Sequence, residues 1–68
     1  MSERIADLVV RLEAIGSDLD DAAFDVLQEA VSAGATRRPA IDKPLTQARR
    51  AVEKAIAALE TAQSIDEA

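Results

Sequence analysis

Alanine dominates the apolar content of this chain and so limits the core that it can build. Of the 68 residues, 49% are hydrophobic, and 15 of these are alanine, which leaves 18 larger apolar side chains. A domain of this length buries only roughly 60% of the surface that its unfolded chain exposes. Because Cys and His are both absent, disulfides and the usual zinc sites cannot compensate for a thin core. We therefore expect stability to come from regular helix packing or from self-association.

Glycine and proline divide the sequence into segments with helical periodicity. Ile5, Leu12 and Ile15 recur at helical spacing, and Gly16 follows them where a helix can end in a left-handed residue. Asp20 is a candidate N-cap for a second segment. The pattern predicts one domain, residues 1–63, with helices at about 3–15, 20–33 and 44–62, a loop at 34–43, and a frayed tail at 64–68.

The third segment carries an apolar stripe with a strip of alanine beside it, and alanine lets another helix approach closely. We expect this longest helix to form the self-association surface. The fold class predicted is all-α: a small three-helix bundle, or an open three-helix unit that completes its core by homodimerisation. The residues expected to bury that surface are Leu45, Ala48, Val52, Ala55, Ile56, Leu59 and Ala62.

Charge is unevenly distributed along the chain. Residues 1–30 carry eight acids and two bases, residues 31–54 carry two acids and six bases, and residues 55–68 carry three acids. Three interpretations are open: the acidic and basic faces lie alongside each other in the fold or across a dimer, one face binds a partner of opposite charge, or both are solvated. The faces themselves are formed by Asp21, Asp25 and Glu29 and by Lys43, Gln47, Arg50 and Lys54.

The residue types exclude several chemistries. Without His or Cys, neither a Ser–His–Asp or Cys–His triad nor a His- or Cys-ligated zinc site can form. The lone glycines, Gly16 and Gly34, do not make a phosphate-binding loop. We therefore expect no enzymatic activity, no cofactor and no metal.

These features favour a bacterial-type cytoplasmic protein, since the start of the chain has neither a signal-peptide apolar region nor a membrane span. We expect a helical protein–protein interaction module or accessory subunit that binds itself and another, unidentified protein. The alternative is a nucleic-acid-associated regulator that uses the basic residues between Arg37 and Lys54, although the pI near 4.5 opposes it. The expected partner-binding residues are Arg37 and Arg38 first, then Asp21, Asp25 and Glu29.

Overall fold

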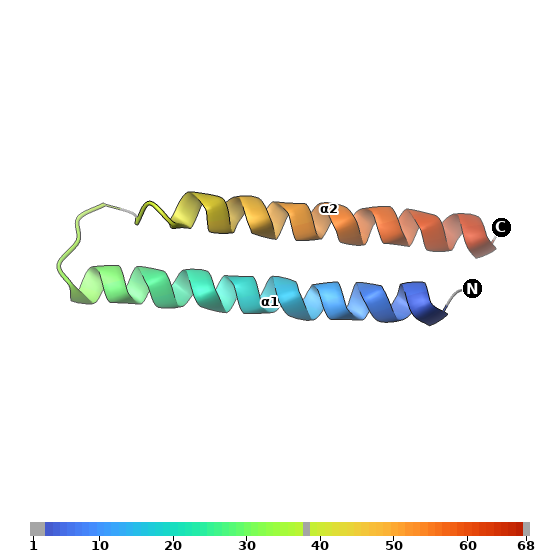
Figure 1. The fold of residues 1–68 in the computed structure, drawn as a ribbon, viewed down its shortest axis with the longest axis horizontal. Coiled ribbons are helices and arrows are strands. Elements are labelled where there is room, and N and C mark those ends of the chain that lie inside the picture. The colour runs from blue at the N-terminus through green and yellow to red at the C-terminus, as the bar shows by residue number, and fades with distance from the viewer. Residues whose placement is uncertain (1–2, 38, 68) are drawn as a thin grey trace.

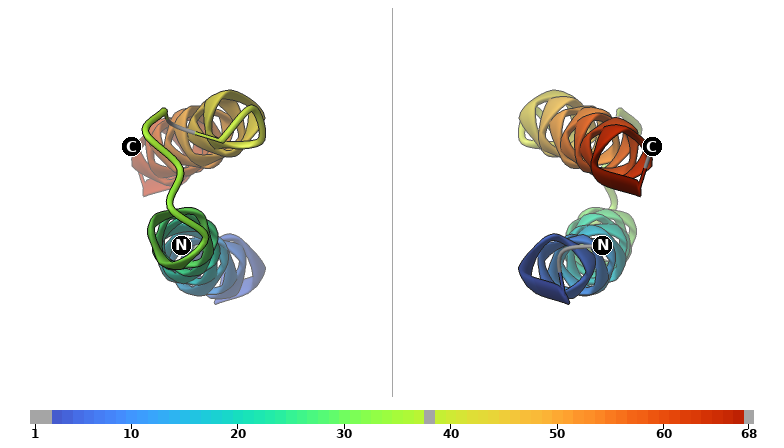
Figure 2. Two further views of the ribbon diagram at one scale, coloured as in Figure 1. Left: turned by 90° about the vertical axis from the view of Figure 1, so that its left-hand side faces the viewer. Right: turned by 90° about the vertical axis from the view of Figure 1, so that its right-hand side faces the viewer.

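The chain folds into a hairpin of two antiparallel α-helices, as seen in the computed structural model, which describes residues 3–37 and 39–67. Helix α1 spans Glu3–Ser32 and helix α2 spans Asp42–Glu67, and the start of α1 and the end of α2 lie at the same end of the hairpin (Figure 1). The molecule measures 54 × 15 × 10 Å along its principal axes. The end-on views in Figure 2 show that the two helices form a single layer. The all-helical prediction is confirmed for the described residues.

The predicted helix break at Gly16 is wrong, because α1 runs without interruption through this residue. The first two predicted helices are therefore one helix, and the three-helix arrangement is replaced by a hairpin. A glycine inside a helix costs only about 1 kcal/mol relative to alanine, which the flanking apolar turns can outweigh. Asp20, predicted to cap a second helix, consequently lies within α1.

The predicted helix end at Gly34 is confirmed within one or two residues. Gly34 has φ of 80°, a value that glycine adopts without the steric cost of a Cβ. Its N–H donates to the carbonyl of Val31 at 3.0 Å, and the N–H of Ala35 donates to the carbonyl of Ala30 at 2.9 Å. This pair of hydrogen bonds is a Schellman motif, which satisfies carbonyls that the end of α1 would leave unpaired.

Helix α2 begins at Asp42, and Pro44 occupies its first turn, where a missing N–H costs no helical hydrogen bond. The carbonyl of Ile41 accepts the first such bond, from the N–H of Leu45 at 3.2 Å. The helix continues to Glu67, beyond the end at residue 62 that the sequence predicts. Ala68 lies outside the described residues.

The two helices pack along stripes with a seven-residue repeat. Ile5, Leu12, Leu19 and Val26 on α1 are half-buried, as are Leu45, Val52 and Leu59 on α2. A seven-residue repeat keeps an apolar stripe facing a neighbouring helix along its whole length. The stripe nevertheless remains partly open to solvent, because none of the described apolar side chains is buried.

Candidate interaction surfaces

Gly16 is the one buried residue in the described part of the chain, and its backbone lies under the side chain of Arg49 from α2. A Cβ at Gly16 would lie 2.5 Å from Nη1 and 3.1 Å from Cζ of Arg49. The glycine therefore provides the space in which the guanidinium crosses α1. The sequence alone suggested that Gly16 ends a helix. The close approach of Arg49 explains the glycine at this position instead.

Arg49 is also held by acidic side chains from both helices. Its Nε donates to Oδ1 of Asp20 at 3.1 Å, and its Nη1 lies 3.6 Å from Oε1 of Glu53. Its side chain is only 33% exposed. Arg49 therefore links the helices, and two carboxylates already balance its charge.

A shallow groove of about 240 Å³ lies beside this ion pair. Both helices contribute to it, and its lining combines the ion pair with the edges of half-buried apolar side chains. It is too small and too open to enclose a drug-sized ligand, which typically occupies about 300–1,000 Å³. The lining residues are Leu19, Asp20, Ala23, Leu45, Thr46, Arg49, Arg50 and Glu53.

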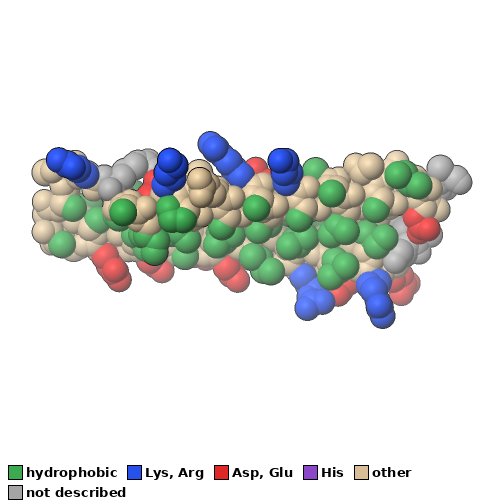
Figure 3. Space-filling model, turned by 45° about the horizontal axis from the view of Figure 1, so that its top comes forward, with side chains coloured by type: hydrophobic (Ala, Val, Ile, Leu, Met, Phe, Trp, Pro, Cys, Tyr) green, Lys and Arg blue, Asp and Glu red, His purple; other side chains and the backbone are tan. Residues whose placement is uncertain are grey.

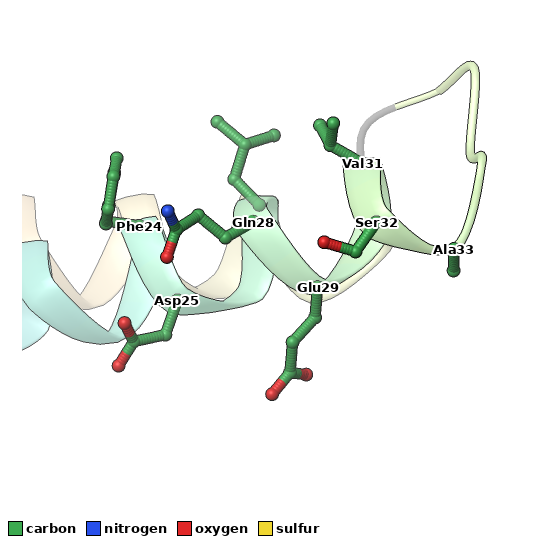
Figure 4. Close-up of a pocket in the computed structure, with 8 residues that line it drawn as sticks. Phe24, Asp25, Gln28, Glu29, Val31, Ser32 and Ala33 are labelled. Atoms are coloured by element: carbon green, nitrogen blue, oxygen red, sulfur yellow. The ribbon is translucent and has the colours of Figure 1, made fainter.

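A cluster of large exposed apolar side chains lies near the end of α1 and is called here the end patch: Phe24, Leu27 and Val31. These side chains are 59%, 40% and 66% exposed. Figure 4 shows Phe24 and Val31 projecting from one side of the helix, and Asp25 and Glu29 from the other. An open depression of about 990 Å³ surrounds this end of α1, and only residues 24–33 line it.

A second apolar surface, called here the alanine face, extends along the hairpin and contains residues of both helices: Leu8, Ile15, Ala51, Ala58 and Ile65. All five are exposed, and Ile15 and Ile65 are 47% and 73% exposed. At about 100° per residue, Leu8 and Ile15 lie on one flank of the half-buried stripe of α1, whereas the end patch lies on the other. The alanine face and the end patch are thus on opposite sides of the hairpin.

Apolar side chains form a band along the side of the molecule that Figure 3 presents. Basic side chains line the α2 edge of this view, and acidic side chains line the α1 edge toward the loop (Figure 3). The two charged faces predicted from the sequence therefore lie on opposite edges of the hairpin. Their members Asp21, Asp25, Glu29, Lys43, Gln47, Arg50 and Lys54 are all exposed.

The predicted self-association residues all lie on the half-buried side of α2, which packs against α1. They are Leu45, Ala48, Val52, Ala55, Ile56, Leu59 and Ala62. The structure uses this stripe for helix packing within one chain. Contact with another chain through the same residues stays a prediction.

Among the predicted partner-binding residues, Arg37 is exposed in the loop, and Asp21, Asp25 and Glu29 are exposed on α1. Arg38 lies outside the described residues. Arg37 in the loop and the acidic face of α1 therefore lie on separate surfaces. The end patch was not predicted from the sequence, because helical spacing alone does not show whether apolar residues such as Phe24, Leu27 and Val31 face another helix or solvent.

Across residues 3–37 and 39–67, no group of three or more acidic side chains is placed to hold a metal ion. Neither helix, over its described residues, is both long and apolar enough to cross a membrane. Comparison with protein-family models, with characterised protein sequences and with solved structures finds no match.

Proposed function

We propose that this chain is a protein–protein interaction module whose apolar surfaces are completed by another polypeptide. One observation carries the proposal: none of the described apolar side chains is buried, although eight large ones are substantially exposed. Solvent-exposed apolar residues scattered singly are normal, but patches of them mark interaction sites. The end patch and the alanine face are two such patches. The homodimer expected from the sequence is one form that this association can take.

The exposed area supports the same proposal. A compact monomer of 7.2 kDa is expected to expose about 4,100 Å², whereas this chain exposes 5252 Å². The excess of about 1,100 Å² is larger than the roughly 800 Å² that each partner buries in an interface of standard size. The hairpin can therefore bury a full interface and then have the exposed area of an ordinary small domain.

The experiment is thermal unfolding of the purified chain, followed by circular dichroism across a 100-fold range of concentration, together with binding of an apolar fluorescent dye. Association stabilises the folded state by mass action, so we expect the unfolding midpoint to rise with concentration. If the chain instead needs a different protein, the midpoint stays constant and the dye binds the open surface. A constant midpoint without dye binding would show a closed surface and would refute the proposal.

A further inference from the structure

We infer that the occupant of the alanine face is a second copy of this chain, packed about a two-fold axis parallel to the hairpin, with both loops at the same end. This inference rests on the proposed function and names the partner. Such a dimer is a four-helix bundle in which α1 of each copy lies against α2 of the other. The sizes and the charges of exposed residues at matched positions along the hairpin support this arrangement.

The contacts of Arg49 show which residues of α1 and α2 lie at the same height, or level, along the hairpin axis. Arg49 lies over Gly16 and pairs with Asp20, so it is level with the position midway between them. Residue 18 of α1 is thus level with residue 49 of α2. Because the helices are antiparallel and rise equally per residue, each step back along α1 corresponds to one step forward along α2. A rotation about an axis parallel to the hairpin does not change the height of a residue. Residues of α1 in one copy are therefore level with the same residues of α2 in the other copy as they are within a single chain.

At these levels, large side chains of one copy come opposite small ones of the other. Ile15 is level with Ala51 of the second copy to within one residue, and Leu8 is level with Ala58 in the same way. Both pairs are separated by seven residues on each helix, the repeat that helix pairs of this kind require. Alternating large and small residues across facing positions allows interdigitated packing. The alanines of α2 thus provide room for the isoleucine and leucine of α1.

Charged residues on the outer edges of the two helices match in the same register. Asp25 is level with Lys43 of the second copy to within one residue, and Asp18 is level with Arg50 in the same way, again seven residues apart on each helix. All four side chains are exposed in the single hairpin, so they are available at its edges. The two-fold axis creates each pair twice, and it brings the acidic edge of α1 beside the basic edge of α2.

The other face-to-face arrangement places the loops at opposite ends and stacks each helix on its own copy. With the axis at the level of residue 18 of α1 and residue 49 of α2, Leu8 comes level with Glu29 of the second copy to within one residue. An apolar side chain would then meet a carboxylate. Size and charge together therefore favour the arrangement with both loops at one end.

The experiment is sedimentation equilibrium of the full chain and of single-residue variants. We expect a dimer for the wild type and an increase of roughly 100-fold or more in its dissociation constant for Ile15→Glu, because both copies lose an interface anchor. Val10→Glu is the matched control, since Val10 is 62% exposed on the side of α1 away from α2. It should dimerise like the wild type. Should Ile15→Glu lose helicity, Ala58→Glu tests the same contact from the other helix.

Charge exchange tests the orientation of the two copies. Asp25→Lys and Lys43→Glu should each weaken the dimer by roughly 3- to 30-fold, and the double variant should recover most of the wild-type affinity. Weakening by both single variants without recovery in the double variant would refute the arrangement with loops at one end.

Failure of this inference is distinguishable from failure of the proposed function. A wild-type chain that dimerises but is dissociated by Phe24→Glu, and not by Ile15→Glu, associates through the end patch; the inference is then wrong and the proposed function stands. A wild type that is monomeric at every concentration also overturns the inference. The dye-binding measurement then decides the proposed function by itself.

Discussion

Replacing Gly16 by alanine tests how closely Arg49 packs over α1. In an ordinary helix interior this change stabilises by about 0.8–1.0 kcal/mol. Here the new Cβ would lie 2.5 Å from Nη1 of Arg49, so the guanidinium must move. Displacing it from Asp20 forfeits an exposed ion pair that contributes about 0.2–1 kcal/mol. We expect a net gain in the free energy of unfolding of about 0–0.8 kcal/mol.

The assay is urea unfolding followed by circular dichroism at one fixed protein concentration, in the wild-type and Arg49→Ala backgrounds. With Arg49 truncated, Gly16→Ala should give the full gain of about 1 kcal/mol. The coupling between the two positions is the difference between the two gains, about 0.2–1 kcal/mol. Equal gains of about 1 kcal/mol in both backgrounds would refute the packing of Arg49 over Gly16.

Three further changes test other parts of the account. Gly34→Ala should lower the free energy of unfolding by about 1–2 kcal/mol, because an alanine at φ of 80° is strained; an unchanged urea midpoint would contradict the Schellman end of α1. Val52→Asp places a charge in the half-buried stripe between the helices, and it should lower stability by about 2 kcal/mol or more; circular dichroism should show reduced helicity, and unchanged helicity would contradict this placement. Raising the salt concentration should weaken the proposed dimer, since its edge pairs involving Asp25 and Lys43 are exposed and screened; a dissociation constant independent of salt, measured by sedimentation, would argue against those pairs.

The apolar periodicity of each helix was readable from the sequence. Val52 and Leu59 were recognised as one stripe because a repeat of three to four residues survives whatever the stripe packs against. Gly34 was recognised as a helix end because no periodic apolar residue follows it until the next segment. The sequence does not show which helix packs against this stripe, because a face that packs on α1 and a face that packs on another chain have the same apolar pattern.

Gly16 shows where local reasoning failed. A glycine after an apolar repeat is compatible with a helix end and also with the close approach of another side chain. The choice depends on Arg49, which is distant in the sequence and becomes a neighbour only when the chain folds back. The acidic run after Gly16 reinforced the wrong choice, because Asp20 can cap a helix or pair with a cation. Both ambiguities are resolved by a tertiary contact.

The central claim is that another polypeptide completes the apolar surface of this hairpin, and that a second copy does so on the alanine face. Sedimentation equilibrium of the wild-type chain beside Ile15→Glu tests it most directly. The account predicts a mass of twice 7.2 kDa for the wild type at high concentration and of 7.2 kDa for the variant. Equal masses for the two proteins at every concentration would contradict it.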